Sequence, residues 1–166
     1  VPYEKTVSYG GGTNKGPSTI LNASWQLEKW DGKSNPCDLG IYTCPPVDCS
    51  VSSQQVIDNI ANATAEIIRN GGIPVVLGGE HTVTYGVIKG LKDAGIEDFG
   101  IVQIDAHADL RHAYEGDILS HASVMKRAVD MGIPLPTGNS CILWRRDAGA
   151  RGVWCVLPGC RWIGAE

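Results

Sequence analysis

Residues 53–131 alternate two kinds of apolar pattern, and this alternation constrains the fold more than any other feature. Residues 54–70 place Val56, Ile57, Ile60 and Ile67 on one helical face, and Gly71-Gly72 supplies a stop. The run IPVVL at 73–77 then predicts a buried strand. The same sequence of patterns follows a second time, with a helix at 83–94, a strand FGIVQI at 99–104, a loop at 110–119 and a helix at 121–131.

Apolar strands that alternate with amphipathic helices are typical of a parallel sheet covered on both faces. We therefore expect an α/β fold, a three-layer α/β/α arrangement with a mostly parallel sheet. Ligands of such sheets bind beyond the carboxyl ends of the strands.

The first 53 residues are rich in turns, and a short helix is expected at 18–30 after Pro17. The Gly10-Gly11-Gly12 run with Lys15 suggests a phosphate-binding loop. We reject that interpretation because Lys15 precedes a glycine and no Gly-Lys-Ser/Thr follows.

Composition excludes several classes of protein. The 166 residues suffice for one domain with a substantial core, and the net charge of −4 comes without a basic stripe, which argues against nucleic acid as a partner. No apolar run reaches the roughly 18 residues of a membrane span, and no signal-peptide pattern precedes the first helix. Because the chain opens at Val1-Pro2, we expect that it begins inside a longer gene product.

The six cysteines are compatible with two cellular locations of the protein, secreted or cytoplasmic. Disulfides and the acceptor patterns at Asn22 and Asn62 would fit a secreted protein. Asn62 falls inside a predicted helix, however, and a domain of this size does not need covalent cross-links. We expect a cytoplasmic protein with reduced thiols, and no structural zinc site because no Cys-x-x-Cys pair occurs.

Two polar motifs stand at the ends of the predicted strands. GGEH at 78–81 follows the first strand, and DAHAD at 105–109 follows the second. Side chains two residues apart in an extended segment share a side, so Asp105, His107 and Asp109 should converge, with His81 arriving from the neighbouring strand. Imidazoles with carboxylates suit Mn²⁺, while Zn²⁺, Fe²⁺ or Co²⁺ stay open by ligand type.

Each motif also has a purely structural interpretation. GGEH alone fits a turn with a solvated histidine, and DAHAD alone fits a charged loop. His121, in LSHASV, could simply enter a helix after Ser120, a plausible N-cap. Their order and their place at strand ends favour a site.

GGEH, then DAHADLR and then SHAS resembles the ureohydrolase (arginase/agmatinase) family, and VPYEKTVSYGGGTNKGPSTIL, DLRHAYEG and SHAS are most similar to agmatinases. The resemblance covers residues 1–135. It implies that His81, Asp105 and Asp109 bind one manganese ion and that His107 binds a second, with Asp105 bridging. It also implies that His121 is the catalytic proton-shuttling histidine.

The chemistry of guanidino hydrolysis agrees with these residues. A guanidinium carbon is a poor electrophile, and metal coordination can lower the pKa of water to roughly 7, which provides hydroxide at neutral pH. A histidine can protonate the leaving amine. The resemblance implies a manganese-dependent hydrolase that converts agmatine to urea and putrescine, a step of polyamine biosynthesis. Other guanidino substrates, such as guanidinobutyrate and arginine, stay open, and a homo-oligomer is expected for the intact enzyme.

The chain departs from the family pattern after about residue 135. The family completes its two-metal site with a later Asp-x-Asp pair, whereas the only acidic residues after His121 are Asp130, Asp147 and Glu166. Protein ligands are then too few for a firmly held second metal, so we expect little or no activity from the chain as written. The second interpretation is a non-catalytic, metal-binding or interaction remnant.

Residues 136–166 form an atypical tail without strand–helix rhythm. Codons for residues 136–141, read one base later, can spell Gln-Leu-Gly-Ile-Arg-Ala, which resembles the family's next strand. We hypothesise a shift of reading frame near residue 136; a divergent tail in a genuine short protein is the alternative. A gene whose shifted frame lacks a downstream Asp-x-Asp would contradict the shift.

Overall fold

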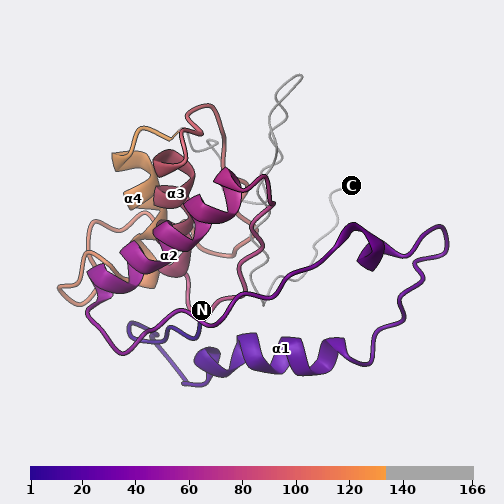
Figure 1. Ribbon diagram of the computed structural model, residues 1–166. Helices are drawn as coiled ribbons and strands as arrows, with labels where there is room; N and C mark the ends of the chain where they lie inside the picture. The colour runs from indigo at the N-terminus through magenta and orange to yellow at the C-terminus, as the bar shows by residue number, and fades with distance from the viewer. Residues whose placement is uncertain (134–166) are drawn as a thin grey trace, which may run out of the picture.

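A computed structural model describes residues 1–133 of the chain, and three helices form its centre (Figure 1). These are α2 (Ser53–Arg69), α3 (Val83–Asp93) and α4 (Val124–Asp130). Helix α1 (Gly16–Ser24) lies apart from them in Figure 1. Short 3₁₀ helices occur at Thr13–Lys15, Pro36–Leu39 and His121–Ser123. The helices predicted at 54–70, 83–94 and 121–131 are confirmed, the last as a 3₁₀ turn that continues into α4.

Helix α2 packs closely on α3 because two glycines lie at their contact. A Cβ atom at Gly86 would come within 2.7 Å of Ile60 Cβ, and one at Gly90 within 2.6 Å of the carbonyl oxygen of Ala61. Any larger residue would therefore separate the two helices. Ser52 begins α2 as its N-cap, and its side chain accepts a hydrogen bond from the backbone N–H of Gln55.

The core consists of two clusters on either side of α3. One cluster joins Tyr3 to the facing sides of α2 and α3 through Val56, Ile60, Val83 and Val87. The other places Ile88 of α3 against Ala128 of α4 and against Ile133, which lies beyond the end of α4. Helix α3 thus contributes to both clusters. Residues 78–82 lead directly into α3, so their position is fixed relative to the core.

The predicted parallel sheet is not seen in residues 1–133, where the ladder contacts are limited to one isolated antiparallel bridge between Tyr114 and Asp117. The runs 73–77 and 99–104 belong to no strand. A run forms a strand only where a neighbour completes a ladder of backbone hydrogen bonds, and within residues 1–133 no such ladder includes either run. The three-layer α/β/α sheet therefore remains a prediction.

The backbone after IPVVL pairs with the first residues of the chain instead. The N–H of Gly79 donates to the carbonyl of Val1 at 3.2 Å, and the N–H of Glu80 donates to the carbonyl of Tyr3 at 3.0 Å. Gly79 lies so close to Tyr3 that a Cβ atom there would overlap the Tyr3 backbone. Residues 1–3 therefore hold the turn that leads to His81.

Helix α1 and the residues after it form an exposed arm. The helix ends at Ser24 rather than at residue 30, and Pro17 is its buried residue. Trp25 is 85% exposed and Leu27 is 74% exposed, so no packing on residues 25–30 favours a continued helix. Among the described residues, no helix is both long and apolar enough to cross a membrane. The predicted tail at 136–166 lies outside the described residues.

Candidate metal centre

His81, Asp105 and Asp109 meet at one point beside the start of α3. The Nδ1 atom of His81 lies 2.7 Å from Oδ2 of Asp109 and 3.4 Å from Oδ2 of Asp105. One ligand atom from each of the three residues fits within 4.8 Å of the others. Asp109 is buried and the side chain of Asp105 is only 10% exposed. The positive charge that compensates these two shielded carboxylates can come from the protonated ring of His81 or from a bound cation.

The backbone of Asp109 is held by the beginning of α4. Its carbonyl oxygen accepts hydrogen bonds from the N–H groups of Met125 and Lys126, at 3.1 and 3.3 Å. Asp109 has a φ of 49°, a left-handed conformation that aspartate tolerates better than most residues. The side chain of Gln103 donates to Oδ2 of Asp109 at 3.5 Å and to the carbonyl of His107 at 3.1 Å. These contacts fix the direction of the Asp109 carboxylate.

His107 does not join the other three ligand candidates. Its side chain is 83% exposed, and its Nδ1 lies 3.7 Å from Oδ1 of Asp105. The cause is local: the same Oδ1 accepts a hydrogen bond from the backbone N–H of His107 at 2.9 Å, which bends the chain as an Asx turn. The expected alternation of an extended segment is therefore broken, and Asp105 lies between His81 and His107.

The carboxylates govern the protonation of His81. The hydrogen bond with Asp109 raises the pKa of His81, followed by the negative charges of Asp109 and Asp105, while burial opposes the rise. One nitrogen and two carboxylate oxygens at these distances form a donor set for a divalent cation of intermediate hardness. The residues present therefore fit a metal ion.

His121 lies in a separate hydrogen-bonded cluster. Its Nδ1 is 3.2 Å from the hydroxyl of Thr6, and its Nε2 is 2.9 Å from the hydroxyl of Ser8. The ring also packs edge-on against Tyr114, with centroids 5.3 Å apart and an interplanar angle of 72°. The structure thus ties His121 to the start of the chain.

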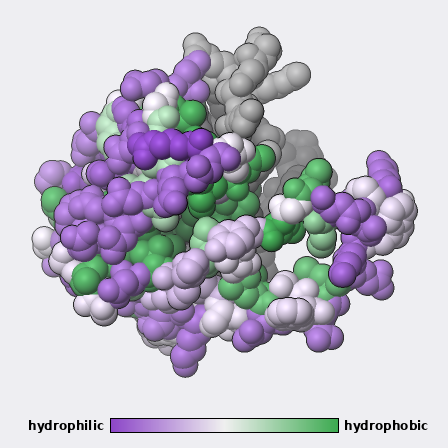
Figure 2. All heavy atoms as spheres, viewed as in Figure 1, coloured by the Kyte–Doolittle hydropathy of each residue, from purple (hydrophilic) through white to green (hydrophobic). Residues whose placement is uncertain are grey.

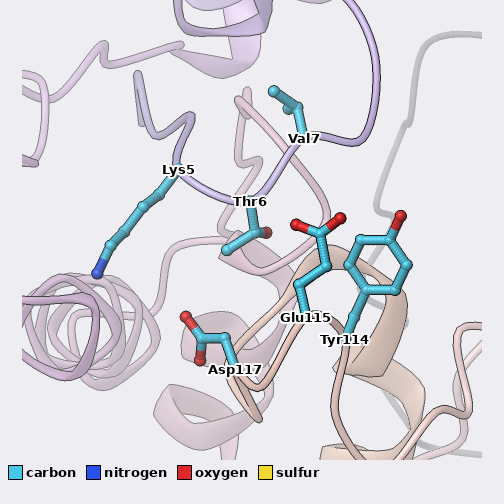
Figure 3. Close-up of a pocket in the computed structure, with 6 residues that line it drawn as sticks. All are labelled: Lys5, Thr6, Val7, Tyr114, Glu115 and Asp117. Carbon is cyan, nitrogen blue, oxygen red and sulfur yellow. The ribbon is translucent and has the colours of Figure 1, made fainter.

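A small cavity of about 180 Å³ opens beside this cluster (Figure 3). The turn at Tyr114–Asp117 forms one wall, and its central residues Glu115 and Gly116 both have positive φ. Such a pair is typical of a tight type I′ turn. The residues that line the cavity are Lys5, Thr6, Val7, Tyr114, Glu115 and Asp117.

Comparison with known proteins identifies the family of the chain. The sequence model of the arginase family matches residues 1–148. The chain belongs to the arginase family. Its resemblance to agmatinases and related ureohydrolases, expected from the GGEH, DAHAD and SHAS motifs, is confirmed, and the family's proteins are α/β enzymes.

Individual relatives are hydrolases of guanidino compounds by name. An N(1)-aminopropylagmatine ureohydrolase of Synechocystis is 39% identical over 81% of this chain and 46% of its own length. An agmatinase of Bacillus subtilis is 33% identical over 79% of this chain and 46% of its own. The solved structure of the agmatine ureohydrolase of Thermoplasma volcanium superposes with a TM-score of 0.72 at 31% identity, over 83% of this chain and 45% of that one. The chain thus spans about half the length of the relatives that it matches.

The roles of several residues near the site were not predicted from the sequence. Glu80 stands directly before His81 in GGEH, yet it has different partners, because its buried carboxylate accepts hydrogen bonds from Thr6 and Thr82. Thr6 and Ser8 contact His121 from more than 110 positions away, and no local pattern signals such a contact. For Glu80 the signal was present, because an acidic residue after an apolar run needs a partner.

Proposed function

We propose that the intact protein hydrolyses the guanidino C–N bond of agmatine to give urea and putrescine. The observation that carries the proposal is the joined group of His81, Asp105 and Asp109 in a chain of the arginase family. In this family, relatives of similar sequence are named for agmatine and aminopropylagmatine.

We propose manganese as the cofactor, with His81, Asp105 and Asp109 as ligands of one ion and His107 as a ligand of a second. The two oxygens of Asp105 support a bridging role, because Oδ2 faces His81 while Oδ1 faces His107. The metal would supply hydroxide at neutral pH. The exposed His107 has few protein partners, which agrees with a weakly held second ion in this chain.

His121 is the proposed proton donor to the leaving amine. An imidazole changes its charge near neutral pH, and it is the commonest general acid in enzymes. Its contacts with Thr6 and Ser8 hold the ring beside the cavity. They keep it separate from the cluster of His81, Asp105 and Asp109.

A second substrate has its own support. The relative with 39% identity is named for N(1)-aminopropylagmatine, whereas the agmatinase of Bacillus subtilis is 33% identical. Both compounds carry the same guanidino group, so the chemistry is unchanged. Guanidinobutyrate and arginine are further alternatives. The intact enzyme is proposed to be a cytoplasmic homo-oligomer; within residues 1–133, Cys37, Cys44 and Cys49 are free thiols, which supports a reducing compartment.

The chain as written is proposed to bind metal with little or no turnover, as a remnant would. Urea release from agmatine with added Mn²⁺ separates an active enzyme from such a remnant: we expect almost none from the 166-residue chain and strong release from a frame-restored version. Rapid urea formation by the short chain would show that the later carboxylate pair is dispensable.

Metal binding itself is tested by titration calorimetry with Mn²⁺. Asp109→Asn keeps the size and the left-handed backbone but removes a charge, so we expect an at least tenfold loss of affinity. Asp38→Asn, in an exposed 3₁₀ helix, is the control and should bind as the parent chain does. Equal affinity in both variants would exclude Asp109 as a ligand.

A further inference from the structure

A chain of hydrogen bonds links the buried carboxylate of Glu80 to the ring of His121. The hydroxyl of Thr6 lies 2.9 Å from Oε1 of Glu80 and 3.2 Å from Nδ1 of His121. The same hydroxyl accepts the backbone N–H of His121 at 2.9 Å. Glu80 is only 4% exposed, so its carboxylate depends on protein donors.

The direction of each hydrogen bond follows from the inventory of donors. The Thr6 hydroxyl is the donor to Oε1 of Glu80, so its single hydrogen points to that carboxyl group. The two lone pairs of the Thr6 oxygen then accept the backbone N–H and the Nδ1–H of His121. Every donor and acceptor of that hydroxyl is thereby used, and Nδ1 must carry a proton.

The other oxygen of Glu80 fixes the carboxylate itself. Oε2 accepts from the backbone N–H of Thr82 at 2.9 Å and from the Thr82 hydroxyl at 2.6 Å. Thr82 directly precedes α3, so this anchor belongs to a packed helix. The far end of the chain of hydrogen bonds is therefore held rigidly.

We propose that Thr6 and Glu80 are positioning residues that hold neutral His121 in its Nδ1–H tautomer, in which the Nε2 lone pair accepts from the hydroxyl of the exposed Ser8, 2.9 Å away. Which ring nitrogen carries the proton is set by the hydrogen bond of the other nitrogen. Resting on the proposed function, the inference makes Nε2 the atom that first takes up a proton from water, which gives the imidazolium, and then passes that proton to the leaving amine. After that transfer the ring is neutral and its remaining proton is on Nδ1, which donates a hydrogen bond to the hydroxyl oxygen of Thr6.

The tautomer is measured by long-range ¹H–¹⁵N correlation NMR of the full chain with ¹⁵N-labelled histidine, without metal or substrate, at a pH where the ring is neutral. His121→Gln identifies the resonances by their loss. We expect Nδ1 as the protonated nitrogen in the parent chain. A predominantly Nε2–H ring would overturn the inference.

Substitutions in the hydrogen-bond chain make the test specific. Thr6→Val removes the hydroxyl with little change of shape and should make Nε2–H the major tautomer, whereas Thr6→Ser should restore Nδ1–H. Thr13→Val is the matched control, because the Thr13 hydroxyl also donates to a carboxylate, that of Glu4, at 2.8 Å. It should leave the tautomer of His121 unchanged.

Glu80→Gln gives a second, independent readout should Thr6→Val fail to fold. Because Oε2 accepts two hydrogen bonds, the amide oxygen should occupy that position and the NH₂ group should face Thr6. The Thr6 hydroxyl would then accept from the amide and donate to Nδ1, which converts His121 to Nε2–H. A folded Glu80→Gln variant that keeps Nδ1–H would contradict the inference. The urea assay tests the proposed function instead, so failure of one proposal can be distinguished from failure of the other.

Discussion

At the scale of single residues, the site depends on side chains with two roles each. Asp105 turns the backbone through one oxygen and faces His81 with the other. Asp109 offers its carboxylate to His81 and its carbonyl to α4. Glu80 and His81 are neighbours in sequence but face different partners, Thr6 and Asp109. A short polar motif can therefore serve two clusters.

Cys49 offers a residue-scale prediction of pH dependence. Burial, with a smaller part from Asp48, raises the pKa of its thiol, although the positive N-terminal amine opposes the rise. The reactive thiolate therefore appears only at higher pH than for an ordinary cysteine. We expect iodoacetamide to label Cys49 more slowly than the exposed Cys37 at about pH 8, close to the ordinary thiol pKa, as followed by peptide mass spectrometry.

In that measurement, Cys44 serves as a second exposed reference. Tyr3→Ala should accelerate the labelling of Cys49, because Cys49 packs against the cluster that contains Tyr3. Equal rates for all three cysteines in the parent chain would contradict the packing of this region.

The sequence predicted that three of the four candidate ligands lie together, and it misplaced the fourth. His81, Asp105 and Asp109 were placed together from their positions at the ends of apolar runs, and the structure brings them into contact. His107 was placed with them by an alternation that the Asx turn of Asp105 interrupts. Such turns depend on a side-chain rotamer, and periodicity contains no information about rotamers.

At the scale of elements, the α2–α3 contact is set by small residues. Helix periodicity predicted both helices almost to their ends, since the apolar stripe and the terminal glycines are local signals. The long-range contacts were not predictable in the same way. Gly86 and Gly90 lower helix propensity when taken alone, and only the facing backbone of α2 explains them.

Gly90→Ala tests this contact through the sign of its effect. In an open helix this change stabilises by about 0.5–1 kcal/mol. Here the new methyl group would meet the Ala61 carbonyl and Thr64, so overpacking should destabilise the fold by about 1–3 kcal/mol. Urea denaturation followed by circular dichroism measures the difference.

Asn62→Ala provides the control on the exposed side of α2. It should leave the free energy of unfolding unchanged or slightly higher, because alanine has the better helix propensity. A Gly90→Ala variant more stable than the parent chain would mean that α2 and α3 do not pack this closely.

At the scale of the whole molecule, apolar side chains remain uncovered. Ile73 is 65% exposed and Val75 is 70% exposed, while Pro74 is buried and Val76 packs against the core. Figure 2 shows further hydrophobic residues on the visible face among hydrophilic regions. The run 73–77 thus has one buried and one open side.

We expect the open side to cause self-association. Light scattering of the chain should rise with protein concentration, because unpaired apolar segments recruit one another. Replacing both exposed residues, Ile73→Lys with Val75→Lys, should reduce the scattering. Leu39→Lys, at a 92% exposed position in a short helix, should have little effect. A parent chain that stays monodisperse at all concentrations would contradict this expectation.

The hydrogen bonds of the Asp109 carbonyl make two backbone amides of α4 sensitive to changes at the cluster of His81, Asp105 and Asp109. The two donors to this carbonyl, the amides of Met125 and Lys126, lie in the first turn of α4, where helix amides have no partner inside the helix. Their deuterium uptake therefore depends on the loop at Asp109 rather than on α4 itself. A cation that steadies this loop should slow uptake at these two amides more than at the amides of α2, so isotope labelling can detect occupancy without any assay of turnover.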